Sequence, residues 1–251
     1  MFPGRRRHGQ LIAETRRVAE LDTPTRTAMW ALYRTYYARA EEHRFADDLA
    51  GKDEVILVRD AADASLQGFT TLTSYRHEVD GRRLRVLFSG DTIIAAPYQG
   101  QTALQRAFVR YLMLLVVRHP REEVYWFLIS KGYKTYLLLS RNFLEYWPRH
   151  DRPTPPRAAA ILASLARARF GHAYRPEAGI IRFDPPGPRL ESWVAPVEPA
   201  ALARPDVRFF LERNPGWAEG DELCCVGRVD LAMGVNYLRR LVARRLRSAR
   251  P

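Results

Sequence analysis

Hydrophobic and polar positions recur along the chain in patterns that predict a mixed set of strands and helices. Residues 11–21 are expected to form the first strand. A helix should follow, because Thr23 suits an N-cap position, Pro24 suits the first helical position, and apolar residues behind them recur at helical spacing. Those apolar residues are Met29, Leu32, Tyr33, Tyr36 and Tyr37.

Three strands are predicted next. They are residues 54–60, 66–79 and 82–94. Gly68 is an expected bulge in the second of them. Asp80 and Gly81 form a hairpin signal between the last two, because both residues tolerate a positive φ. Two antiparallel strands should therefore lead directly into the small and polar loop that follows residue 94.

Helical spacing returns at about residues 100–118 and ends at a short polar segment. The apolar run 124–130 is typical of a strand that is covered on both faces. Residues 131–143 are expected to form a short helix. The predicted order is thus strand, helix, three strands, helix, strand, helix.

A proline-rich joint at residues 149–157 marks a change of composition. We predict a core in residues 1–150 and an extension in residues 151–251 that completes the same domain. The extension should contain a helix at 156–170, two strands and a last helix. The two strands are expected in "AGIIRF" (178–183) and "DELCCVGRV" (221–229), and they should pair against the 124–130 strand.

The last helix has an apolar face with arginines opposite. Its apolar residues are Leu231, Val235, Leu238, Val242 and Leu246. We expect this face to dock the helix on the core. The alternative is that the basic helix binds an anionic membrane.

The chain has 251 residues, of which 47% are hydrophobic, enough to bury a substantial core. Its formal net charge is +12, and all but three of its 40 basic residues are arginine. The arginines are spread along the chain and form no basic and aromatic nucleic-acid module. Specific nucleic-acid binding is therefore not expected, whereas a general attraction to acidic partners is.

Cys224 and Cys225 are adjacent, so we expect two buried free thiols on successive strand positions. The sequence has no metal-ligand spacing, and no metal is expected. The N-terminal segment lacks the apolar stretch of a secretory signal, and the longest apolar runs, such as 111–117, are too short to span a bilayer. These features predict a cytoplasmic protein without a transmembrane segment.

The element order and the stretch "APYQGQTALQRAF" (96–108) together resemble the GNAT superfamily of N-acyltransferases. That family has the turn [R/Q]-x-x-G-x-[G/A], often within "PxYRGRGIGRALL". Tyr98 and Gly100 are in matching places, Pro97 is next to the position of the pattern's proline, and Gln99 is at the leading position. Thr102 and Leu104 depart from the pattern, because they replace a glycine and a second small residue. The resemblance covers about residues 11–148.

The resemblance implies an α/β (α+β) fold with a mixed, mainly antiparallel central sheet flanked by helices. It also implies that the turn before the helix holds the pyrophosphate of coenzyme A, because helix N-termini favour phosphate. The pyrophosphate residues would be Gln99, Gly100, Gln101, Thr102, Ala103 and Leu104. Backbone groups of Ile94, Ala95 and Ala96 would hold the pantetheine.

A second family signature, N-x-x-A-x-x-x-Y-x-x-x-G-F, carries the tyrosine that serves as general acid. Aligning Asn142 and Phe143 with its last two residues puts Leu138 at the tyrosine position. Tyr136 and Tyr133 are nearby. Tyr136 is the candidate acid, with ordinary packing as the alternative.

The resemblance also suggests an acidic base on the central strands. Asp91 is the candidate, because a buried carboxylate with a raised pKa can take a proton from an ammonium group. The alternative is that Asp91 caps a turn after Gly90. Glu78 and His77 on the preceding strand are weaker candidates.

The predicted function is transfer of an acyl group from a thioester to an amine of a small molecule or peptide. The donor would be an acyl-CoA, either acetyl-CoA or a longer chain, and an acyl carrier protein is the alternative carrier. Four bulky residues suggest room for a long chain, although core packing is the favoured explanation for them: Phe88, Phe108, Trp126 and Phe127. The alternative function is a non-catalytic GNAT-fold binding module. A homo-oligomer is compatible with either.

Overall fold

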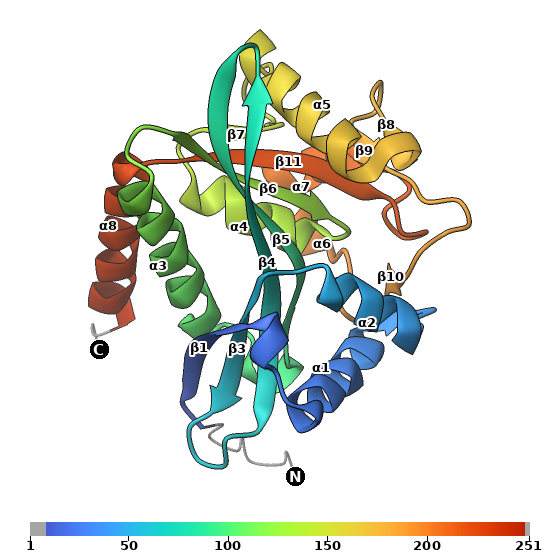
Figure 1. Ribbon diagram of the computed structural model, residues 1–251, viewed down its shortest axis with the longest axis vertical. Helices are drawn as coiled ribbons and strands as arrows, with labels where there is room; N and C mark the ends of the chain where they lie inside the picture. The colour runs from blue at the N-terminus through green and yellow to red at the C-terminus, as the bar shows by residue number, and fades with distance from the viewer. Residues whose placement is uncertain (1–8, 249–251) are drawn as a thin grey trace. The chain divides into compact units, whose positions relative to one another are not determined.

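The computed structural model describes residues 9–248 (Figure 1). The chain divides into two compact units whose segments interleave along the sequence. Unit 1 comprises residues 9–36, 40–73 and 89–110. Unit 2 comprises residues 37–39, 74–88 and 111–248. Neither unit corresponds to residues 1–150 or 151–251, and that division of the chain stays a prediction.

Unit 1 contains a four-stranded antiparallel arrangement with helices. Its elements are β1 (Leu11–Arg17), η1 (Val18–Glu20), α1 (Thr23–Tyr36), α2 (Glu42–Ala50), β3 (Glu54–Asp60), parts of β4 (Leu66–Val79) and β5 (Arg82–Ile94), η2 (Ala96–Tyr98) and the start of α3 (Ala103–Arg118). The strand order is β1-β3-β4-β5. The pairing of β3 with β4 shifts register between Val58 and Arg59, next to Gly68. The predicted bulge is therefore confirmed.

Two predicted boundaries at the start of the chain were wrong. The first strand ends at Arg17 and not at residue 21, because the chain turns into a 3-10 helix at Val18. The N-cap of α1 is Asp22 and not Thr23, since Asp22 Oδ1 accepts a hydrogen bond of 2.9 Å from the Thr25 N–H. A carboxylate is an effective acceptor for the free N–H groups of a first turn.

Unit 2 contains the rest of the sheet. Its elements are β2 (Tyr37–Ala38), parts of β4, β5 and α3, β6 (Glu123–Ser130), α4 (Tyr133–Asn142), β7 (Tyr146–Trp147), α5 (Pro156–Phe170), η3 (Gly171–Ala173), β8 (Tyr174–Arg175), β9 (Ile180–Ile181), β10 (Arg189–Leu190), α6 (Pro199–Leu202), α7 (Pro205–Arg213), β11 (Glu222–Val229) and α8 (Leu231–Ser248). The strand order is β4-β5-β6-β11-β9-β8, with β7 on β11 and a separate β10-β2 pair.

The strand pairing in unit 2 follows the sequence closely. Asp80 (φ 50°) and Gly81 (φ 71°) form the predicted turn between β4 and β5. β11 pairs antiparallel with β6, as expected for "DELCCVGRV". The "AGIIRF" segment is shorter than predicted and pairs with β11, not with β6. The sheet is mainly antiparallel and helices flank it, which confirms the predicted fold class.

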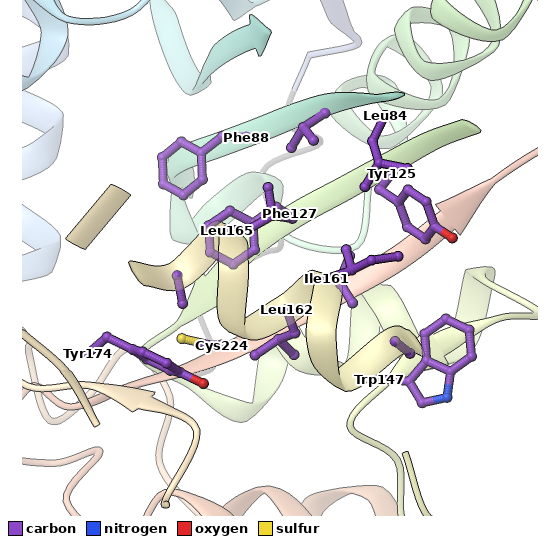
Figure 2. Close-up of a cluster of buried hydrophobic side chains, with 14 of the residues drawn as sticks. Leu84, Phe88, Tyr125, Phe127, Trp147, Ile161, Leu162, Leu165, Tyr174 and Cys224 are labelled. Atoms are coloured by element: carbon purple, nitrogen blue, oxygen red, sulfur yellow. The ribbon is translucent and has the colours of Figure 1, made fainter. Parts of the chain in front are cut away.

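A hydrophobic core of unit 2 lies between α5 and the sheet (Figure 2). Phe88 of β5 and Phe127 of β6 belong to it, with ring centroids 5.7 Å apart. Trp126 packs instead on Phe143, at 5.2 Å. Phe88, Phe127 and Trp126, which were proposed to line an acyl-chain site, thus have aromatic packing partners.

The two cysteines are free and buried on successive positions of β11, as predicted. Burial raises the pKa of each thiol well above its ordinary value. Cys224 belongs to the core that α5 covers. Both thiols therefore remain protonated and unreactive in the folded protein.

Candidate functional site

The candidate site is the turn of unit 1 that joins β5 to α3. β5 ends at Ile94, η2 spans Ala96–Tyr98, and α3 begins at Ala103. The Ala95 N–H donates to the Gln67 carbonyl over 2.7 Å, and the Ala96 N–H donates to the Tyr36 hydroxyl over 2.6 Å. The first half of the turn is thus fixed to β4 and to the end of α1.

A tyrosine–carboxylate contact fixes the middle of the turn. The Tyr98 hydroxyl donates to Asp60 Oδ2 over 2.5 Å, and Asp60 Oδ1 accepts from the Ala62 N–H over 2.9 Å. The hydrogen bond to Asp60 raises the pKa of Tyr98 to about 12, because the carboxylate stabilises the protonated phenol. Asp60 itself is buried at the end of β3.

A glutamine fixes the second half of the turn. Gln101 Oε1 accepts a hydrogen bond of 3.2 Å from the Leu11 N–H, and its Nε2 donates to the Gly9 carbonyl over 3.1 Å. Its side chain therefore points to the first strand. Side chains and backbone from β1, β3, β4 and α1 together hold this turn in place.

Free N–H groups gather where α3 begins. The N–H groups of Gln99 and Gln101 donate to carbonyls within the turn. Within residues 9–248, by contrast, the N–H groups of Gly100 and of residues 102–105 have no hydrogen-bond acceptor. A helix start leaves such donors unpaired and adds a partial positive charge. This cluster of N–H groups, which we name the amide tip, is suited to an anion.

The amide tip tolerates the two departures from the family pattern. Gly100 has φ 95°, and a Cβ placed there would meet no atom of residues 9–248 within 4 Å. The φ of Thr102 is not positive, and the Thr102 carbonyl accepts a hydrogen bond of 2.9 Å from the Arg106 N–H. The Leu104 side chain is buried. Only Gly100 therefore needs to be a glycine for conformational reasons.

Some of the backbone groups of residues 94–96, which were predicted to hold the pantetheine, already make hydrogen bonds within the protein. The N–H groups of Ala95 and Ala96 are bonded to Gln67 and Tyr36, as described above. The carbonyls of both alanines accept from the N–H groups of Tyr98 and Gln99. A donor at this position would have to use Ile94 or the second lone pairs of these carbonyls.

Asp91 lies inside β5, which continues to Ile94. The alternative that Asp91 caps a turn after Gly90 is therefore wrong. Gly90 instead allows a close approach of strands, because a Cβ there would lie 2.5 Å from Thr71 Oγ1. Asp91 is partly buried, and its role as a base stays a prediction.

Tyr136, in unit 2, has the surroundings of a core tyrosine. It is 0% exposed, and its hydroxyl donates to the Pro148 carbonyl over 3.0 Å. The rings of Tyr146, Phe209 and Phe210 pack around it, and burial raises its pKa. Tyr133 is similarly occupied, since its hydroxyl donates to the Pro196 carbonyl. This geometry supports packing roles, and the catalytic assignment of Tyr136 remains untested.

Sequence reasoning missed the residues that hold the turn. Tyr36 was assigned to the buried stripe of α1, and Asp60 was only the last residue of a strand. Neither has a local signal for its role, because each meets the turn only through the fold.

Among residues 9–248, no three His, Cys, Asp or Glu side chains are placed to hold a metal ion, and no helix is long and apolar enough to cross a membrane.

No protein-family model matches the chain, and no curated protein matches it. Several solved structures are similar over part of their length. A probable N-acyltransferase of Enterococcus faecalis, a conserved protein of unknown function, is 14% identical with a TM-score of 0.39. That match covers 56% of this chain and 37% of the E. faecalis protein.

Two further similar structures come from Escherichia coli and Arabidopsis thaliana. The GNAT-family N-acetyltransferase YhbS of E. coli, in complex with CoA, is 15% identical over 51% of this chain and 68% of its own, with a TM-score of 0.37. NAA60 of A. thaliana, in complex with a bisubstrate analogue, is 15% identical over 56% of this chain and 86% of its own, with a TM-score of 0.40. Similarity at this level says nothing of activity. The described residues themselves form a mainly antiparallel sheet flanked by helices, with a strand-to-helix turn between β5 and α3.

Proposed function

We propose that this protein is an N-acyltransferase that uses an acyl-CoA as its thioester donor. The observation that supports this most directly is the amide tip, where the N–H groups of Gly100 and residues 102–105 have no acceptor in the described part of the chain. Such a cluster at a helix N-terminus favours a phosphate group through hydrogen bonds and the helix dipole. Tyr36, Tyr98 and Gln101 hold the turn through hydrogen bonds within the protein, so little ordering would be needed on binding.

Different residues around the amide tip would bind different parts of the acyl-CoA donor. Within the predicted stretch 99–104, the N–H groups of Gly100 and residues 102–104 would receive the pyrophosphate, whereas those of Gln99 and Gln101 are bonded within the turn. The Thr102 hydroxyl, at the place of the family glycine, would donate to a phosphate oxygen. Ile94 and the carbonyls of Ala95 and Ala96 would contact the pantetheine.

The chemistry needs one proton acceptor from the protein. An amine nitrogen attacks the thioester carbonyl, a C–N bond forms, and the C–S bond breaks with departure of a thiolate. The proton of the amine passes to Asp91, directly or through a water molecule. A thiolate leaves readily near its own pKa and needs little help from an acid. The proposal therefore does not use Tyr136.

The acceptor class is an amine of a small molecule or peptide. The donor carrier can be tested separately, because an acyl carrier protein presents pantetheine without the nucleotide. Binding of free CoA through the amide tip would favour acyl-CoA. Binding of only an acylated carrier would favour the acyl carrier protein.

The test is a thermal-shift titration with CoA and a series of acyl-CoA thioesters. A ligand that binds the folded state should raise the melting temperature in a concentration-dependent way. Gly100→Trp should abolish that shift, because the indole would fill the open space at the tip. The matched control is Gly81→Trp, since Gly81 has a positive φ (71°) and equally open surroundings but lies in the β4–β5 hairpin.

Each outcome is informative. Shifts in the wild type and Gly81→Trp, absent in Gly100→Trp, support the donor site. No shift with any thioester refutes it. Binding without acyl transfer to any of a panel of amines would favour a non-catalytic binding module, a reading that Leu138 at the family's tyrosine position favours.

A further inference from the structure

The last helix, α8, docks by a different face from the one the sequence predicts. Among residues 231–243, the buried residues of α8 are Met233, Gly234 and Tyr237, and a Cβ at Gly234 would lie 2.5 Å from Met113 Sδ of α3. The predicted docking residues are exposed: Leu231 by 65%, Val235 by 48%, Leu238 by 59% and Val242 by 55%. The expectation that they dock the helix was therefore wrong. Leu246 has no described side chain.

These four exposed residues, which we name the α8 stripe, lie on one face. They recur at spacings of four, three and four residues, which a helix places one above the other. On α3, which packs beside α8 at Met113 (Figure 1), Val117 is 69% exposed and Leu114 is 40% exposed. Large aliphatic side chains grouped in this way on a surface indicate a contact with an apolar partner.

The charge of α8 narrows the choice of partner. The helix contains five arginines and no acidic residue: Arg239, Arg240, Arg244, Arg245 and Arg247. Pairing the stripe with a second copy around a twofold axis would bring arginine-rich helices together and cost energy through like-charge repulsion. A partner with an anionic surface above an apolar interior would match both the α8 stripe and the arginines of the helix.

We propose that α8 binds the surface of an anionic phospholipid bilayer. The α8 stripe would enter the boundary between headgroups and acyl chains, and arginine side chains would reach lipid phosphates. The helix would lie in the plane of the interface and not cross it. This inference does not depend on the proposed acyl transfer.

The test is co-sedimentation of the full chain with phosphatidylcholine vesicles, with and without phosphatidylglycerol. We expect binding to the anionic vesicles only, weakening as salt is raised. Val235→Glu with Leu238→Glu should lower the partition coefficient about tenfold or more, since two apolar contacts are lost and two negative charges gained. The matched control, Leu144→Glu with Leu202→Glu, changes two exposed leucines (47% and 41%) elsewhere and should lose less than threefold, roughly the effect of charge alone.

Far-UV circular dichroism and the melting temperature establish that both variants fold. The proposal is overturned if the wild type does not bind anionic vesicles, or if the two double variants lose binding equally. It is also overturned if light scattering shows a dimer that Val235→Glu with Leu238→Glu dissociates, while vesicle binding is absent. In that case a second copy covers the stripe.

Discussion

The side chain of Gln101 joins the turn before α3 to the first strand, with its Oε1 3.2 Å from the Leu11 N–H that donates to it. This residue falls within the stretch predicted to hold a pyrophosphate, yet its side-chain amide points to β1. Gln101 is therefore a positioning residue in the proposed donor site. Its backbone, not its side chain, lies in the turn that would face a phosphate.

We expect Gln101→Ala to weaken donor binding without direct loss of a ligand contact. It removes two hydrogen bonds, so a loosened turn should raise the dissociation constant for CoA about fivefold, equivalent to about 1 kcal/mol. Isothermal titration calorimetry measures this directly. Gln99→Ala is the control, because Gln99 is exposed, and an equal loss in both variants would contradict the positioning role.

The Tyr98–Asp60 hydrogen bond predicts a loss of stability at alkaline pH. The folded state holds the Tyr98 proton to a pKa of about 12, above the ordinary value of 10.0, so this contribution is complete below pH 10. It is lost as the pH rises from 10 to about 12. The free energies of unfolding of the wild type and Tyr98→Phe, measured with urea, should therefore differ most below pH 10 and converge near pH 12. A constant difference across this range would argue against the linkage.

Asp91→Asn tests the proposed base. Loss of a positioned proton acceptor should lower kcat/KM on the order of a hundredfold or more, while the thermal shift with CoA is retained. The control is Asp80→Asn, because asparagine also tolerates the left-handed conformation of that turn (φ 50°). If Asp91→Asn keeps full activity, another group takes the proton.

Tyr136→Phe separates packing from catalysis. The variant keeps the buried ring and loses the hydrogen bond to Pro148, so the free energy of unfolding should fall by about 1 kcal/mol, with kcat unchanged. Steady-state kinetics with denaturant unfolding gives both quantities. A large fall in kcat at unchanged stability would restore Tyr136 as the acid.

Local patterns were sufficient for most of the elements. β3, β4 and β5 have the predicted bounds, and α5 has the predicted range. The reason is that alternation, helical spacing and turn residues such as Asp80 and Gly81 act over a few positions. The wrong boundaries, at residues 17–23, depended on a cap and a short turn whose signals are weak.

Local sequence patterns could not predict the face by which α8 docks. Its sequence holds two apolar sets, one with Met233 and Tyr237 and one with Val235 and Leu238, and hydrophobic spacing favours the larger set. Only the packed protein shows that Gly234 comes close to Met113 and so selects the other face.

The sequence by itself determined most of the longer strands and helices, although not α2 or α7, together with the buried thiols and the place where a helix begins after Gly100. Each of these follows from residues close together in the chain. The tertiary structure decided what holds that turn, which tyrosines are buried and which face of α8 is exposed. These properties depend on partners far apart in sequence, such as Tyr98 with Asp60 or Gln101 with Leu11, which only folding brings together.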